Sequence, residues 1–235
     1  LHSVDGFVYM SEQVHSELRA YSDAPALFSP HPLFENFGER VERSEACVRL
    51  GLDPANRYVL FFGLIRDYKG LDLLLDAWAQ LRRAGRTEGR RLIVAGEFYT
   101  AREPYLNRIA DNGLQDEVLL HDRFIPDNDV KYYFSAADFV VQPYKTATQS
   151  GVTQIAYNFE LPMIVTDVGG LPEIVPDGRV GYVCRPDAAG VADALVRICE
   201  GDTLARFRSA MREEKRRFSW EEMCDRITEL YESIR

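Results

Sequence analysis

Two cations, Arg66 and Lys69, stand three residues apart shortly after an apolar run that ends at Gly63. The run, residues 58–62, predicts a β-strand, and the pattern after Gly70 predicts a helix whose amino end stays open to an anion. A strand, a glycine turn, two cations and a helix form an arrangement that holds phosphate near the carboxyl end of a strand. Cations placed there can also stabilise a phosphate that departs as a leaving group. The local pattern alone fits two solvated loop cations equally.

The segment 142–152 offers a second group of candidate anion ligands. It follows an apolar run and precedes a helical pattern, so it also lies at the carboxyl end of a predicted strand. Backbone N–H groups around Gly151 and the hydroxyls of Thr148 and Ser150 could bind a diphosphate. An ordinary helix capped by Ser150 is the alternative that these residues leave open.

Three weaker candidates follow other predicted strands. Glu173, in the turn 167–173, could bind a sugar hydroxyl or complement the dipole of its own helix. The ring of Phe124 either contacts a nucleobase or belongs to the core, and Glu97 has no stronger local claim than loop solvation. The histidines form no cluster, so no metal site is predicted.

Composition restricts the classes of ligand and the compartment. Of the 235 residues, 46% are apolar and 11% aromatic, which supports a substantial core. The net charge of −9 argues against nucleic acid as a partner, so an anionic ligand must meet a few placed cations. No apolar run approaches the roughly 18 residues of a membrane span, and no secretory signal peptide is recognisable. Four scattered cysteines predict reduced, mostly buried thiols in a cytosolic protein (Cys47, Cys184, Cys199 and Cys224).

Short apolar runs alternate with helical patterns from residue 58 onward. The runs lack polar alternation, as is typical of parallel strands that are covered on both faces. The alternation predicts an α/β fold with a doubly wound parallel sheet. The expected strands are 59–62, 91–95, 118–121, 139–141, 163–166 and 181–183, and the expected helices are 71–83, 105–112, 127–137, 151–159, 171–175 and 188–200.

The two ends of the chain do not fit this sheet. Residues 1–34 read as the last strand, helix and strand of a preceding domain, with Ser11 capping the helix. The first residue is not methionine, so we expect a piece of a longer protein. A final helix follows its cap, Ser219, and the charged run 212–217 before it predicts a solvated face.

The ordered motifs resemble the C-terminal domain of family 4 (group 1) glycosyltransferases. They are FFGLIRDYKG at 61–70, VAGE at 94–97, QPY at 142–144 with residues 132–138 leading into it, and VGGLPE at 168–173; the likeness covers roughly residues 31–220. The resemblance implies the Rossmann-like C-terminal half of a GT-B fold, in which two domains face a cleft and this one holds a nucleotide-sugar. It also implies transfer with retention of configuration, with no cofactor and no divalent metal.

The resemblance assigns roles to most of the candidates. Arg66 and Lys69 would neutralise the charge that grows on the nucleoside diphosphate as the sugar–phosphate bond breaks, and are the expected catalytic residues. Phe124 and Ile125 would lie against the base. The remaining donor-binding residues are Gly63, Glu97, Thr148, Gln149, Ser150, Gly151, Val152 and Glu173.

One departure from the family pattern concerns two glutamates eight positions apart. Alanine and isoleucine, Ala147 and Ile155, occupy those positions here, and neither side chain accepts a hydrogen bond from a sugar hydroxyl. Either Thr148, Gln149 and Gln154 replace the glutamates or donor binding has decayed; the intact cations and glycines favour replacement.

We therefore expect the donor-binding half of a retaining glycosyltransferase, acting on an unidentified glycan or lipid-linked acceptor in the cytoplasm. Any peripheral membrane contact would run through the missing domain, and this chain alone should not turn over. The expected organisation is 1–34 for the end of the preceding domain with its linker, 35–218 for the nucleotide-sugar-binding domain, and 219–235 for a crossover helix. A catalytically inactive nucleotide- or glycan-binding module is the main alternative; a GT-B sugar-nucleotide epimerase is a weaker one.

Overall fold

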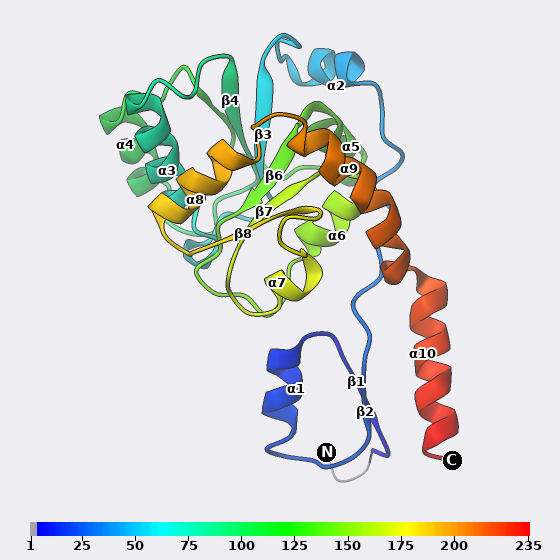
Figure 1. Ribbon diagram of the computed structural model, residues 1–235. Coiled ribbons are helices and arrows are strands. Elements are labelled where there is room, and N and C mark those ends of the chain that lie inside the picture. Colours follow the sequence, from blue (N-terminus) through cyan, green and yellow to red (C-terminus); the bar gives the residue numbers. More distant parts are fainter. Residues whose placement is uncertain (1–3) are drawn as a thin grey trace.

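The computed structural model describes residues 4–235 and contains a six-stranded, wholly parallel sheet (Figure 1). The strand order is β5-β4-β3-β6-β7-β8, so the chain first builds outward from β3 and then returns to place β6 on its other side. This is a doubly wound sheet, as the sequence predicts. Its strands are β3 (Arg57–Phe62), β4 (Arg90–Ala95), β5 (Val118–His121), β6 (Phe139–Gln142), β7 (Met163–Thr166) and β8 (Gly181–Cys184).

Helices cover both faces of the sheet because alternate residues of each apolar strand point to opposite sides. In β3, Tyr58 and Leu60 belong to one buried cluster, while Val59 and Phe61 belong to the other. Figure 1 shows α3, α4 and α8 on one face and α2, α5 and α6 on the other. These helices and their neighbours are α2 (Arg43–Leu50), α3 (Leu71–Arg83), α4 (Glu103–Asp111), α5 (Asp127–Ala136), α6 (Gly151–Asn158), α7 (Leu171–Ile174), α8 (Ala188–Arg197) and α9 (Thr203–Glu214), with short 3₁₀ turns at Asp67–Lys69 and Lys215–Phe218.

Two helices, α2 and α9, are absent from the sequence-based expectation. The buried residues of α2 are the small Ala46 and Cys47, which give almost no apolar pattern. In α9, three buried residues recur four positions apart among charged ones (Thr203, Phe207 and Met211). That spacing is a helical signal, but it is masked by the surrounding charges.

The charged run 212–217 is not simply a solvated face. The side chains of Arg212 and Lys215 each lie 2.8 Å from the carboxylate of Glu160, which comes from the turn after α6. Arg217 donates to the carbonyl oxygens of Glu173 and Ile174, at 3.1 and 2.9 Å. The expectation is therefore correct for the exposed Arg212, Glu213 and Arg216 but incomplete, because Arg212, Lys215 and Arg217 also fasten the end of α9 to the sheet domain.

The N-terminal residues form a small separate unit below the sheet (Figure 1). Strands β1 (Phe7–Tyr9) and β2 (Ala26–Phe28) pair in parallel and are linked by α1 (Glu12–Leu18), with Ser11 as its cap. The last helix, α10 (Trp220–Ser233), begins at the predicted cap Ser219 and runs beside this unit, where Arg226 donates to the carbonyl of Phe28 at 3.3 Å. The first three residues of the expected segment 1–34 lie outside the described residues.

All four cysteines are free, but only Cys47 is fully buried. Cys184 and Cys199 are half-buried against the core, and Cys224 is exposed on α10. The expectation that most are buried is therefore correct only in the weaker sense that three of the four pack against apolar side chains. Among residues 4–235, no helix combines the length and apolar character that crossing a bilayer requires.

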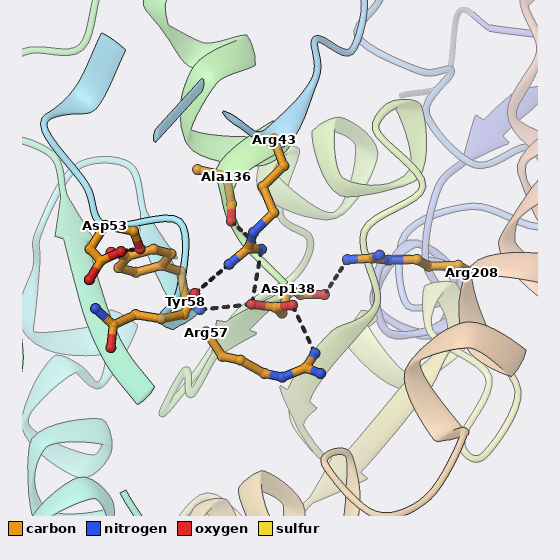
Figure 2. A network of polar contacts seen from close by, with 8 residues as sticks. Arg43, Asp53, Arg57, Tyr58, Ala136, Asp138 and Arg208 are labelled. Carbon is orange, nitrogen blue, oxygen red and sulfur yellow. Dashed lines mark hydrogen bonds and ion pairs between the residues drawn. The ribbon is translucent and has the colours of Figure 1, made fainter. Parts of the chain in front are cut away.

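The buried carboxylate of Asp138 fixes the junction of the two central strands (Figure 2). It accepts hydrogen bonds from the backbone N–H of Tyr58 at 2.8 Å, from Arg43 at 3.2 Å and from Arg57 at 3.3 Å. The backbone N–H of Asp138 in turn donates to the carbonyl of Tyr58 at 2.8 Å. Asp138 thus joins the start of β6 to the start of β3 and to α2.

Replacing Asp138 with alanine should destabilise the chain strongly, since three donors lose their acceptor in a buried place. We expect a loss of about 2–4 kcal/mol, and a smaller loss for Asp138→Asn, which keeps an oxygen for Tyr58. Urea unfolding followed by circular dichroism measures both.

The matched control is Asp129→Ala, which removes the partner of the exposed Arg49 at 3.3 Å and should cost about 1 kcal/mol or less. Equal losses in Asp138→Ala and Asp129→Ala would contradict the central role of Asp138.

Candidate functional site

A pocket of about 290 Å³ lies where the order of the strands reverses. The loop after β3 turns toward β4 and the loop after β6 turns toward β7, so the carboxyl ends of β3 and β6 leave a crevice between them. Gly63 and Lys69 come from the first loop, and Gln149, Ser150, Gly151 and Val152 come from the second loop and the start of α6. The other lining residues are Phe34, Phe37, Phe62, Tyr68, Tyr144 and Ile155.

The two loops approach each other so closely that only glycine fits at position 70. Gly70 has a φ of +68°, and a Cβ there would collide with the carbonyl oxygen of Pro143. The backbone N–H of Lys145 also donates to the carbonyl of Tyr68, at 2.7 Å. Gly70 therefore lets the second loop pack against the first. The expectation that the amino end of α3 is open to an anion stays a prediction.

Lys69 places its ammonium in this pocket without a carboxylate partner. The side chain is half-buried, and Nζ lies 5.7 Å from the centre of the Tyr144 ring. Among the described residues, no acidic side chain lines the pocket and no salt bridge forms to Lys69. Burial, and secondarily the charge of Arg66, lowers the pKa of Lys69 to about 8. A half-buried ammonium without a counter-ion is the kind of group that binds an anionic ligand.

Arg66, the second predicted cation, lies beside the pocket rather than in its wall. Its side chain is exposed, and the guanidinium lies 5.2 Å from the centre of the Tyr99 ring. It is near enough to Lys69 to lower the pKa of that ammonium. Of the two predicted cations, Lys69 thus lines the pocket and Arg66 lies beside it.

The amino end of α6 is capped by its own side chain. Ser150 Oγ accepts from the N–H of Val152 at 3.2 Å and lies 3.1 Å from the hydroxyl of Tyr144, which confirms the N-cap reading. Gly151 allows the ring of Phe34 to approach, since a Cβ at 151 would lie 3.2 Å from that ring. An aromatic ring therefore covers part of the helix terminus that the sequence assigns to a diphosphate.

Three predicted donor residues contact segments of the chain that do not line the pocket, two through their side chains and one through its backbone. The carboxylate of Glu173 accepts from the backbone N–H of Glu12, at 3.1 and 3.2 Å, and so caps the first turn of α1 instead of serving its own helix. Gln149, although it lines the pocket, donates its amide to the carbonyl of Met10. The exposed Thr148 accepts from the N–H of Gly170 through its carbonyl, at 3.1 Å.

The candidates that follow β4 and β5 do not line this pocket. Phe124 is 65% exposed, so the core alternative is wrong for it, whereas Ile125 is 8% exposed and belongs to the core. The expectation that the Phe124–Ile125 segment lies against a base stays a prediction, in which the exposed Phe124 ring or the backbone, and not the buried Ile125 side chain, would make the contact. Glu97 is half-buried, and its carbonyl accepts from the N–H of Ile65 at 2.8 Å. None of the three lines the pocket.

The aromatic wall of the pocket is what the sequence-based reasoning missed. Phe34 and Phe37 come from an irregular segment at least twenty residues before β3, and the rings of Tyr68 and Tyr144 meet edge to face with 6.0 Å between their centres. The only sequence signal for this wall was a pair of phenylalanines close together before the first strand of the sheet. The aromatic rings can pack on a flat or apolar ligand surface while Lys69 binds an anion.

Comparison with known proteins is consistent with this architecture. The D-inositol 3-phosphate glycosyltransferase of Jonesia denitrificans is 28% identical over 201 residues, which cover 83% of this chain and 47% of that protein. Sucrose-phosphate synthase from Thermosynechococcus elongatus has the same fold, with a TM-score of 0.82, 24% identity and coverage of 100% of this chain and 59% of that one. Anabaena HepE, in complex with UDP-glucose, matches with a TM-score of 0.76, 20% identity and coverage of 98% and 64%.

The chain spans about half the length of the curated relatives it matches. The model of the family described as glycosyl transferases group 1 matches residues 56–201, which is more than half of the 235 residues and includes both loops of the pocket. The chain therefore belongs to the group 1 glycosyltransferases.

Proposed function

We propose that this chain is the donor-binding half of a glycosyltransferase and holds a nucleotide-sugar in the pocket between the loops after β3 and β6. The observation that carries the proposal is the ammonium of Lys69, which lies among aromatic rings at the switch point of the sheet with no carboxylate partner among the described residues. Family membership supports the same reading. The relative HepE, which has this fold, was solved with UDP-glucose.

In this proposal, different residues of the pocket contact different parts of the donor. Lys69 binds a diphosphate oxygen and offsets the charge that develops there as the sugar leaves, and Arg66 adds a second, more solvated charge. Tyr68, Tyr144 and Phe62 give the donor an apolar surface. We propose retention of configuration and transfer without a divalent metal or cofactor on the basis of the family resemblance alone.

We propose that the acceptor, a glycan or lipid-linked sugar, is met by a second domain, because the relatives are about twice as long as this chain. We assign residues 1–34 and 219–235 to the junction between this domain and the second domain. We also propose that the protein is cytoplasmic. The direct test is release of nucleoside diphosphate from a panel of nucleotide-sugars by the full-length protein, with and without EDTA. Loss of all release in EDTA would contradict metal independence.

An inactive binding module is the second candidate function, favoured by one observation. Neither Ala147 nor the buried Ile155 supplies the carboxylates that the family pattern places at these positions. Such a module would bind the nucleoside diphosphate but release none from any nucleotide-sugar, so binding and turnover together separate the two candidates.

Lys69→Ala should weaken binding of a nucleoside diphosphate by about tenfold to a hundredfold, since a charge-assisted hydrogen bond in a half-buried site is lost. Arg66→Ala should cost only about threefold, because that side chain is exposed. Isothermal titration with UDP, GDP and ADP measures these changes and ranks the nucleotides.

The matched control for both is Lys145→Ala. Lys145 lies on the second loop outside the pocket, with its ammonium 2.7 Å from Asp72, and its removal should change affinity by less than about twofold. An unchanged affinity in Lys69→Ala would rule out the diphosphate assignment.

Binding should also depend on pH through Lys69. Its pKa in the free chain is about 8, and a bound anion raises that pKa, so affinity should be flat below pH 8 and fall above it. The fall should approach tenfold per pH unit until the pKa of the bound state is reached. Lys69→Arg keeps its charge throughout this range and should lose the decline. Titrations between about pH 7 and 9.5 decide the point, and parallel profiles for wild type and Lys69→Arg would refute it.

A further inference from the structure

A second pocket lies at the opposite end of the central strands, around Asp138 (Figure 2). It has a volume of about 310 Å³, and four arginines line it together with a single carboxylate. The arginines come from separate parts of the chain: Arg40 precedes α2, Arg43 begins it, Arg57 starts β3, and Arg208 lies on α9. The remaining lining residues are Pro54, Ala55, Asn56, Ser135, Ala137 and Asp138.

One of these arginines is fully explained by the fold. Arg43 donates to the carbonyls of Ala136 and Asn56, at 2.8 and 2.5 Å, and to the carboxylate of Asp138. That carboxylate also accepts from Tyr58 and Arg57, so most of its hydrogen-bonding capacity is used. The single acid of the pocket therefore balances one cation and leaves the others in excess.

Arg208 and Arg40 are the cations that the fold does not account for. Arg208 donates one N–H to the carbonyl of Asp138 at 3.1 Å, but its Nε is buried without a hydrogen-bond partner. Burial and then the charge of Arg40 lower the pKa of Arg208, with Arg43 and Arg57 adding to the effect and Asp138 opposing it. Arg40 is exposed and makes no hydrogen bond or ion pair to the described residues.

We propose that this pocket binds a phosphate group, carried either by a small soluble molecule or by a phospholipid headgroup. Guanidinium groups that converge from several elements offer many N–H donors in planar forks, which a tetrahedral oxyanion accepts better than a single carboxylate does. The local excess of positive charge stands in a chain whose net charge is −9. In this proposal, the Nε–H of Arg208, which is buried without a partner in the described residues, donates to a phosphate that enters the pocket, and the exposed guanidinium of Arg40 adds positive charge at the rim.

The carboxylates nearby do not remove this excess. Asp202 lines an adjoining pocket with Arg57, Arg90 and Arg208, so the cations still outnumber the acids when both pockets are counted together. No salt bridge joins Asp202 to these arginines in the described part of the chain. A phosphate dianion would supply the missing negative charge.

The phosphate pocket is independent of the donor pocket. Arg57 begins β3 and Gly63 follows its last residue, so the two pockets lie at opposite ends of one strand, about 20 Å apart. Both can be occupied together, and the proposal does not rest on the assignment of a nucleotide-sugar.

Titration of the 235-residue chain with inorganic phosphate tests the proposal, with ionic strength held constant by potassium chloride. All titrations use a Lys69→Ala background, which should weaken any phosphate binding to the donor pocket. Arg208→Gln should weaken binding about tenfold and the exposed Arg40→Gln about threefold. An Nε-selective NMR spectrum should show the Arg208 N–H shift as phosphate is added.

The matched control is Arg206→Gln, an exposed arginine two positions away on the same helix and outside the pocket, which should change affinity by less than twofold. Arg40→Gln leaves the Asp138 contacts intact, so its result does not depend on the folding of Arg208→Gln. No binding at 10 mM phosphate, or equal affinity in all three variants, would overturn the proposal.

Vesicles separate the two sources of the phosphate group. Vesicles of phosphatidylcholine with one fifth phosphatidic acid are sedimented with the chain, with pure phosphatidylcholine vesicles as the blank. Co-sedimentation that free phosphate competes away, and that Arg208→Gln and Arg40→Gln reduce, identifies a headgroup. Phosphate binding without co-sedimentation identifies a soluble ligand.

Discussion

The pairing of β3 with β6 is the constraint on which the rest of the structure depends. Tyr58 and Asp138 hold the two strands together by a backbone hydrogen bond and a carboxylate contact, each 2.8 Å long. Because β6 returns to the far side of β3, the chain leaves these two strands toward opposite neighbours, and a crevice lies at their carboxyl ends. The anchoring contact at one end of the strands thus fixes the place where Lys69 and the start of α6 can face each other at the other end.

The fold could be predicted from the sequence because its central elements have strong local patterns. The type of α3 follows from the periodicity of its broad apolar stripe, and that of β3 follows from a short apolar, aromatic-rich run that a glycine ends. The cations Arg66 and Lys69 were recognisable for the same reason: a strand end before them and a helix after them fix their position. In α9 only three buried residues show helical spacing, and the residues between them are mostly polar or charged, so the sequence did not lead to a prediction of this helix.

The composition of the site was less predictable because it depends on contacts between distant segments. Phe34 reaches the pocket from an irregular connection, and a Cβ at position 151 would lie 3.2 Å from its ring, so Gly151 makes room for this contact. Glu173 has a local environment that suits a ligand contact, yet its carboxylate caps α1, more than 150 residues earlier in the chain. Periodicity carries no information on such partners, since it describes a residue's neighbours on its own element only.

Lysine at position 69 has a consequence for the balance between stability and function. An ammonium whose pKa is lowered by burial, and secondarily by the charge of Arg66, adds nothing to the stability of the ligand-free chain, and an apolar side chain of similar length would suit the aromatic surroundings better. The fold by itself therefore does not favour this residue. An anion that binds there completes an unfinished electrostatic arrangement, so part of the affinity is stabilisation that the empty domain lacks. A bound anion would thus supply the counter-charge to Lys69 that no lining residue of the pocket provides.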